Sequence, residues 1–201
     1  MFNFFESLIK PFPQASISQP PNTLFAFFRH YNKGIEKYLI IMSLMTASLA
    51  IGEVYLFSFM GELVDWLSGK PDQALLEEHG SYFLIMGALV LIVMPCMIFL
   101  HTTLIHQTIL GNYPMTIRWS MHRYLLKQSM AFYQDDFAGR LATKVMQTSL
   151  SIREASTKLL DVFVYIIVYF VSILFLVAQG DALFLIPLCL WLGCYILIQL
   201  H

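Results

Sequence analysis

Phe132-Tyr-Gln-Asp-Asp-Phe-Ala-Gly-Arg140 is the most informative stretch of the chain, because it is a short polar turn between two long apolar runs. Basic residues flank it on both sides at helical spacing. A polar turn held between two apolar segments is a surface that a partner domain in water could bind. The stretch therefore predicts a docking elbow, and the rest of the sequence indicates what it connects.

The composition predicts a membrane protein. The chain is 58% apolar and 12% charged, with a mean hydropathy of +0.66, whereas soluble domains carry about 25% charged residues. A net charge of −1 argues against a nucleic-acid partner. About 20 helical residues span a bilayer core, and four apolar runs have that length: 39–60, 82–105, 159–179 and 182–200. We expect an all-α membrane protein with four transmembrane helices.

The lysines and arginines predict the orientation. Arg29, Lys33 and Lys37 precede the first run, and seven basic residues lie between the second and third. The loop between the first two runs carries only Lys70 among several acids. By the positive-inside rule, the N-terminus and the middle segment face the cytoplasm. No cleavable signal peptide is expected, because the first ten residues lack a basic start and a cleavage site.

Residues 20–37 are expected to form an amphipathic elbow helix. Asn22 or Thr23 could cap its first N–H groups, and an apolar stripe follows at helical spacing: Leu24, Phe27, Phe28 and Tyr31. Such a helix would lie in the headgroup plane. The alternative is a helix packed on a protein core, but the sequence offers no soluble core to receive it. Residues 1–19 are expected to be irregular.

The segment 112–158 has too little Gly, Pro and Ser for a linker. Its apolar residues recur every three to five positions among the basic ones, which predicts two amphipathic helices that continue the second and third spans into the cytoplasm. At about 1.5 Å per residue, each arm would reach roughly 30 Å beyond the membrane. Gly111 and Pro114 are expected to bend the first arm.

At this point the chain resembles the transmembrane domain of ABC exporters, in particular a bacterial branch of half-transporters. The matching residues are Arg118-Trp119, His122-Arg123, Leu125-Leu126, Gln128-Ser129, Phe132-Tyr133-Gln134, Asp136-Phe137-Ala138-Gly139-Arg140, Lys144-Val145-Met146-Gln147-Thr148 and Arg153-Glu154. In that family, spans two and three extend into the cytoplasm and are joined by a coupling helix that docks on the ATPase domain. The resemblance covers about residues 20–201 and implies that residues 38–201 are a partial transmembrane domain.

The chain departs from the family pattern of six spans followed by an ATPase domain. It carries no G-x-x-x-x-G-K-[ST] loop to cradle phosphates, so we expect no nucleotide binding and no catalytic activity from this chain. The resemblance assigns ATP, Mg²⁺ and hydrolysis to a missing or separate ATPase domain. It further implies a homodimer when complete, contact with membrane lipid and a place in the bacterial inner membrane. The chain is therefore expected to be the N-terminal part of an exporter, from a truncated gene or a shortened sequence.

The resemblance also assigns the docking residues. These are Tyr133, Gln134, Asp135, Asp136, Phe137, Ala138, Gly139 and Arg140. Tyr133 and Phe137 would be the apolar anchors, the two acids would orient the contact, and Gly139 would allow a sharp turn back. A solvated turn is the alternative for the acids.

Glu53 lies near the middle of the first span. An ionised acid there costs about 2.5–3.5 kcal/mol on insertion scales, so it should face protein or water. A place on the substrate pathway and a hydrogen-bonded structural role remain equally open. The three cysteines fall within spans and are expected to be buried, and no metal site is expected.

Two other functions compete with a transport component. A free-standing four-span scaffold, channel subunit or carrier would also fit the apolar runs. A membrane-embedded enzyme comes last, because no nucleophile, base or metal set is visible in the sequence.

The topology can be tested by cysteine labelling. Because the acidic loop is expected outside, a membrane-impermeant thiol reagent should label Asp72→Cys in intact cells, after the native cysteines are replaced. A matched Lys127→Cys variant should react only after the membrane is opened. Labelling of Asp72→Cys from the cytoplasmic side alone would reverse the assignment.

Overall fold

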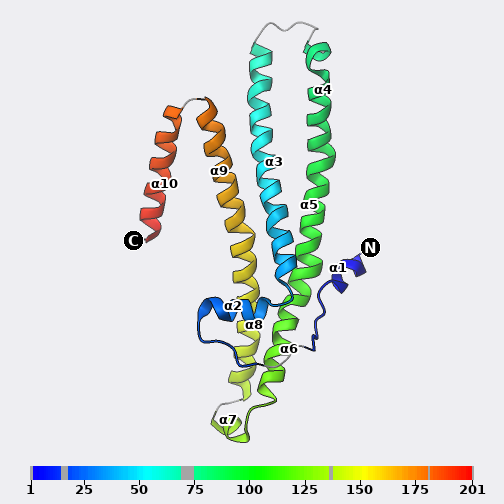
Figure 1. The fold of residues 1–201 in the computed structure, drawn as a ribbon, viewed down its shortest axis with the longest axis vertical. Helices are drawn as coiled ribbons and strands as arrows, with labels where there is room; N and C mark the ends of the chain where they lie inside the picture. Colours follow the sequence, from blue (N-terminus) through cyan, green and yellow to red (C-terminus); the bar gives the residue numbers. More distant parts are fainter. Residues whose placement is uncertain (1, 15–17, 69–74, 136–137, 181, 201) are drawn as a thin grey trace. The chain divides into compact units, whose positions relative to one another are not determined.

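The computed structural model describes residues 2–14, 18–68, 75–135, 138–180 and 182–200. Over these residues the chain is all-helical, with no strand, which confirms the expected all-α class. In chain order, the helices are α1 (Phe2–Ser7), α2 (Leu24–Asn32), α3 (Glu36–Ser68), α4 (Leu75–Ala88), α5 (Met94–Thr103), α6 (Gly111–Leu125), α7 (Met130–Asp135), α8 (Ala138–Leu160), α9 (Val162–Gly180) and α10 (Leu185–Leu200). Figure 1 labels most of them along the ribbon.

Three continuous helical stretches are long and apolar enough to cross a membrane: Glu36–Ser68, His79–Leu125 and Gly139–Gly180. They contain the first three predicted spans. The fourth falls on α10, whose 16 residues include the shorter apolar stretch Leu185–Ile198. The chain is thus an integral membrane protein, and its fourth span stays a prediction.

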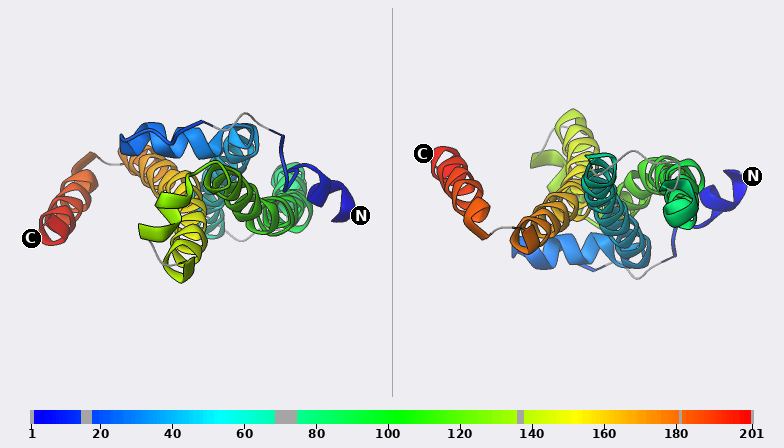
Figure 2. Two further views of the ribbon diagram at one scale, coloured as in Figure 1. Left: turned by 90° about the horizontal axis from the view of Figure 1, so that it is seen from below. Right: turned by 90° about the horizontal axis from the view of Figure 1, so that it is seen from above.

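The chain divides into two compact units. The first contains residues 1–46 and 96–164, and the second contains residues 47–95 and 165–201. In the first unit, α6 and α8 run side by side and lead to α7, while α2 lies across α8 (Figures 1 and 2). One apolar core joins these elements: Ile9, Tyr31, Ile35, Tyr38, Leu39, Met42, Leu104, Ile109, Tyr113, Ile117, Met121 and Ile152.

That core also receives the apolar stripe of the expected elbow helix, whose place in the headgroup plane stays a prediction. Tyr31 of α2 is buried in the core, and Phe27 and Phe28 pack against it, so a protein core does receive this helix. Burial, and to a lesser extent the neighbouring Tyr124, raises the pKa of the Tyr31 phenol. Thr23 is the N-cap by position, but its side chain makes no capping bond. Its backbone carbonyl accepts the Phe27 N–H at 2.9 Å.

A tight turn links α2 to α3. Gly34 has a φ of +91°, a conformation that side-chain-bearing residues rarely adopt. The turn leads the chain from α2 into α3. Within it, the Ile35 N–H donates to the Asn32 carbonyl at 2.9 Å.

A buried hydrogen-bond network joins α2, α6 and α8. The fully buried Tyr113 hydroxyl donates to Asn32 Oδ1, and it lies 3.1 Å from Ser156 Oγ. Asn32 Nδ2 donates to the same Ser156 Oγ at 3.2 Å. These contacts fix the end of α2 against α6 and α8.

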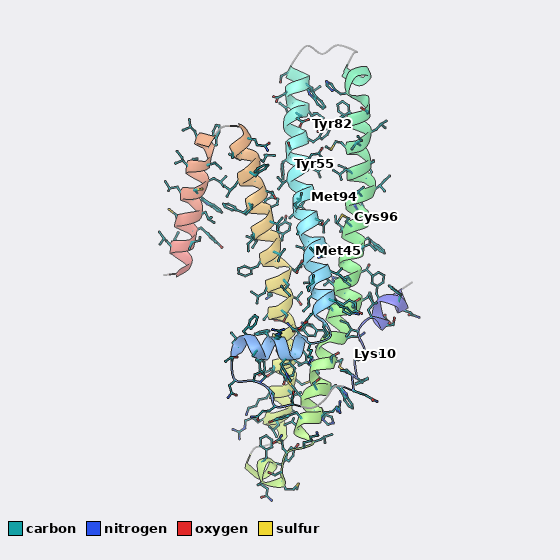
Figure 3. The ribbon with its side chains drawn as sticks, in the orientation of Figure 1. Lys10, Met45, Tyr55, Tyr82, Met94 and Cys96 are labelled. Atoms are coloured by element: carbon teal, nitrogen blue, oxygen red, sulfur yellow. The ribbon has the colours of Figure 1, made fainter. Side chains whose placement is uncertain are left out.

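The N-terminal segment begins with α1, continues without helix or strand through residue 14, and is docked on the protein. A row of side chains on η2 (Leu104–Leu110) and α6 donates hydrogen bonds to its backbone carbonyls, and Tyr38 of α3 adds another to Leu8 at 2.7 Å. The row consists of Thr108 to Phe5 (2.9 Å), Asn112 to Glu6 (2.7 Å), Thr116 to Lys10 (3.2 Å), and Trp119 and Arg123 to Pro13 (3.2 and 3.3 Å). We call residues 5–13 the N-terminal strap; Figure 3 labels Lys10 within it.

Two π-helical segments interrupt the long helix from α4 to α6. The first, η1 (Leu89–Val93), lies just before Pro95, and η2 lies just before Pro114. Proline lacks the N–H that would continue the α-helical ladder, and π-turns are a common response to such a local break. A π-segment therefore lies next to Gly111 and Pro114, and the bend expected there stays a prediction.

In the second unit, α3 packs closely against the segment that begins with α4. A Cβ at Gly52 would lie 3.0 Å from the Met94 sulfur, as expected for small residues at helix contacts in membranes. Tyr55 and Tyr82 point toward each other, with their hydroxyls 3.5 Å apart (Figure 3). Trp66 stacks on His79 at 4.2 Å.

The strap can be tested at its buried residue. Ile9 is 4% exposed in the core, so Ile9→Ala should cost about 2–5 kcal/mol of local stability. Hydrogen exchange of residues 5–13 should accelerate accordingly. The control is Phe4→Ala, because Phe4 is 66% exposed. Equal exchange in both variants would show that Ile9 does not hold the strap.

Candidate functional site

The elbow lies at the tip of two arms. α6 ends at Leu125, and the next residues make turn bonds, including Gln128 N–H to the Leu125 carbonyl at 2.8 Å. α7 then runs from Met130 to Asp135, and α8 starts at Ala138. The two predicted amphipathic helices are therefore present, and a short third helix stands between them (Figure 1).

Tyr133 points back toward α6. Its hydroxyl donates to the Leu125 carbonyl at 2.6 Å, so this oxygen at the end of α6 accepts both Tyr133 O–H and Gln128 N–H. Its ring meets Phe132 edge-on at 5.5 Å and lines a cavity of about 390 Å³ between the arms. Tyr133 thus fixes α7 to the arm, and about a third of its surface (37%) stays exposed.

Among the described residues of the elbow, the most exposed large apolar side chains are not those predicted to dock. Met130 is 75% exposed and Leu126 is 68% exposed. Both lie one or two turns before the predicted docking residues, so their adjacency to that stretch was the available signal. Together with Phe132 they are exposed apolar side chains of the elbow, and methionine and aromatic residues are enriched at the cores of interfaces.

Of the other residues predicted to dock, the structure describes the side chains of some and not of others. Gln134 and Arg140 are exposed. Asp136 and Phe137 lie outside the described residues, as do the side chains of Asp135 and Ala138.

The proposed reason for Gly139 is wrong. Gly139 is the second residue of α8, and it is absent from the described glycines with positive φ. Thr143 Oγ1 donates to its carbonyl at 2.8 Å in the ordinary helical manner. A Cβ at this position would meet no atom within 4 Å, so the structure requires no glycine here.

The two arms are tied together along their length. Arg118 of α6 donates through Nε to Ser149 Oγ of α8 at 3.0 Å, and Ser149 is fully buried. With the Tyr113 network, this contact makes the arms one packed pair, so a displacement at α7 would reach both.

Glu53 is hydrogen-bonded. Tyr165 donates its hydroxyl to Glu53 Oε2 at 2.5 Å, and Tyr169 stacks on Tyr165 at 5.5 Å. Both residues of this bond lie in the second unit. The hydrogen-bonded alternative is therefore realised, while the pathway role stays a prediction.

A second polar cluster lies within the predicted spans and was missed. Thr46 of α3, His101 of α5 and Asp161, which stands between α8 and α9, meet within hydrogen-bonding distance. The signal was an acid inside an apolar run, as for Glu53, but only the fold brings the three residues together.

The cysteines correct another expectation. Cys96, Cys189 and Cys194 are free thiols on exposed helix surfaces, not buried side chains. Over the described residues, no three His, Cys, Asp or Glu side chains converge as metal ligands.

Comparison with known proteins gives the family. The model of the ABC transporter transmembrane region matches residues 39–200. A Haemophilus influenzae protein, described as an uncharacterized ABC transporter ATP-binding protein, is 36% identical over 192 residues. That alignment covers 96% of this chain and 31% of the relative, so the chain spans about a third of the relative's length. No solved structure gave a significant match.

The chain belongs to the ABC transporter transmembrane region family. It is therefore a membrane component of an ABC transporter.

The contact between Tyr133 and the end of α6 can be tested directly. Tyr133→Phe removes one hydrogen bond, worth about 1 kcal/mol, so amide exchange of residues 130–135 should accelerate about fivefold. Tyr195→Phe, which removes an exposed phenol from α10, is the control and should leave that segment unchanged. No acceleration in Tyr133→Phe would mean that the hydroxyl does not hold α7.

Proposed function

We propose that this chain forms part of the translocation pathway of an ATP-driven exporter and carries the docking elbow for its ATPase domain. The observation that carries the proposal is α7. It joins two packed arms that continue membrane-spanning stretches, and it presents exposed apolar side chains at their tip. In this proposal residues 20–37 are the elbow helix, and residues 38–201 are the partial transmembrane domain.

The proposed partner is an ATPase domain outside this chain. The Haemophilus relative is described as an ATP-binding protein, and the chain matches only 31% of its length. ATP and Mg²⁺ would be held by that other domain. A homodimer in the bacterial inner membrane, with lipid around the spans and the N-terminus in the cytoplasm, completes the proposal.

The proposed mechanism is alternating access driven through the elbow. Closure of the paired ATPase domains would pull α7. Because Arg118 joins α6 to Ser149 of α8, and the Tyr113 network joins both arms to α2, the arms would move together. Each arm continues into a membrane-spanning stretch, so the pull would reorient the spans as levers.

The test separates coupling from folding. In the complete transporter reconstituted in vesicles, Phe137→Ala and Met130→Ala should each keep membrane insertion and ATP affinity. Transport and substrate-stimulated hydrolysis should fall about tenfold, because truncation of an interface anchor often costs more than 1 kcal/mol. The matched control is Phe25→Ala, which removes a ring that is 80% exposed on α2.

The outcome for the elbow is decided by comparison with this control. Normal transport and normal stimulation in both elbow variants would reduce α7 to a solvated turn. Loss of ATP affinity itself would place these residues in the nucleotide site instead of a coupling surface.

A further inference from the structure

The junction between α8 and α9 is held by polar side chains from two other membrane helices. Asp161 stands at this junction, between Leu160 and Val162. Thr46 Oγ1 lies 2.5 Å from Asp161 Oδ1 and 2.9 Å from His101 Nε2, and His101 Nε2 lies 3.3 Å from Asp161 Oδ1. All three residues belong to the first unit.

The cluster lies largely out of water. Thr46 is 4% exposed, and the side chains of His101 and Asp161 are 14% and 24% exposed. All three residues fall inside the predicted spans, near the ends assigned to the cytoplasmic side. Ionisable groups at such depth are rare and face other polar groups or water, and they commonly mark ion or proton sites.

The hydrogen positions follow from counting donors. A threonine hydroxyl has one proton, and its shortest contact is with Asp161 Oδ1; the Met42 carbonyl at 3.0 Å is a weaker acceptor of the same proton. Because that proton is used, His101 Nε2 must be the donor in its contact with Thr46. The result is a directed chain, Nε2–H to Oγ1–H to the carboxylate.

The charge of the cluster depends on one further proton. With a neutral imidazole the cluster carries −1 from Asp161, and with a proton also on Nδ1 it is a neutral imidazolium–carboxylate pair. An uncompensated carboxylate is costly in hydrocarbon, so the paired form suits this depth. Of the three side chains in the cluster, the imidazole is the one whose chemistry suits proton exchange near neutral pH.

The neighbouring elements supply few other charges. Ser43 of α3 donates to the Leu160 carbonyl at 2.6 Å, so a second side chain of α3 holds the junction. Lys158 is exposed one turn before Asp161, and Glu53, two turns beyond Thr46, bonds Tyr165. His101 is the basic side chain in contact with Asp161, at 3.3 Å.

We propose that Thr46, His101 and Asp161 form a proton-binding site that holds α3, α5 and the α8–α9 junction together. When the site loses its Nδ1 proton, Asp161 keeps its hydrogen-bond donors, but no imidazolium charge compensates the carboxylate. The junction then opens to water. The ligand is a proton, and the consequence is a junction that loosens as pH rises.

The test uses the full chain in lipid nanodiscs and follows the junction at pH 6 and pH 8. Hydrogen exchange of residues 157–164, corrected for the intrinsic pH dependence of exchange, gives the protection of the junction. In the wild type, protection should fall several-fold at pH 8, and by at most about tenfold per pH unit for one linked proton. His101→Gln and Asp161→Asn should each show one protection level at both pH values.

The control is His30→Gln, which removes a histidine of α2 and should keep the wild-type pH dependence. A purely structural cluster would give pH-independent protection in the wild type and a uniform loss in His101→Gln; that pattern would overturn the proposal. Persistence of the pH dependence in His101→Gln would overturn it equally.

A second measurement covers variants that do not fold. Nitrogen NMR of ¹⁵N-histidine-labelled wild-type chain reports the two ring nitrogens of His101. Nε2 should carry a proton throughout, and Nδ1 should gain one as pH falls from 8 to 5. A ring that stays neutral over this range would rule out the site.

Discussion

The packing of α2 against α6 and α8 depends on the buried hydroxyl of Tyr113. A buried polar group without a partner costs about 1–3 kcal/mol, and Tyr113 avoids this cost only while Asn32 and Ser156 stay in place. Those partners come from α2 and α8, so the network requires three helices to meet at one point. The path of both arms toward α7 follows from that meeting.

The same constraint recurs wherever a helix is interrupted. The Leu125 carbonyl at the end of α6 accepts both Gln128 N–H and the Tyr133 hydroxyl, and Ser43 donates to the Leu160 carbonyl at the end of α8. The side chains of α6 satisfy the carbonyls of the N-terminal strap. In this chain with few charges, hydroxyl and amide side chains donate the hydrogen bonds that join segments. Backbone carbonyls in or near lipid need such donors because they have no water to bond.

Periodicity and composition were enough to predict the long helices and their order along the chain. The first three spans, the two arms and the polar stretch between them follow from apolar patterns, and the family resemblance added the role of the elbow. Long-range contacts were not predictable in this way. A single hydroxyl such as Thr46 belongs to no sequence pattern. The strap is held through its backbone carbonyls, which every residue has. The core under α2 exists only once α6 and α8 pack. Gly139 misled because glycine occurs in helices as well as in turns.

The two π-segments change the direction in which side chains point along the long helix from α4 to α6. Each π-turn inserts about one extra residue, which rotates everything beyond it by about 100° relative to a continuous α-helix. The stripe of residues facing α8 is therefore set by η2 as well as by the sequence of α6. Loss of a single residue between Leu104 and Leu110 would let the helix become regular, and it would turn the donor row and Tyr113 away from their partners without changing any of them. The number of residues in this segment therefore matters to these contacts as much as the identity of the residues that make them.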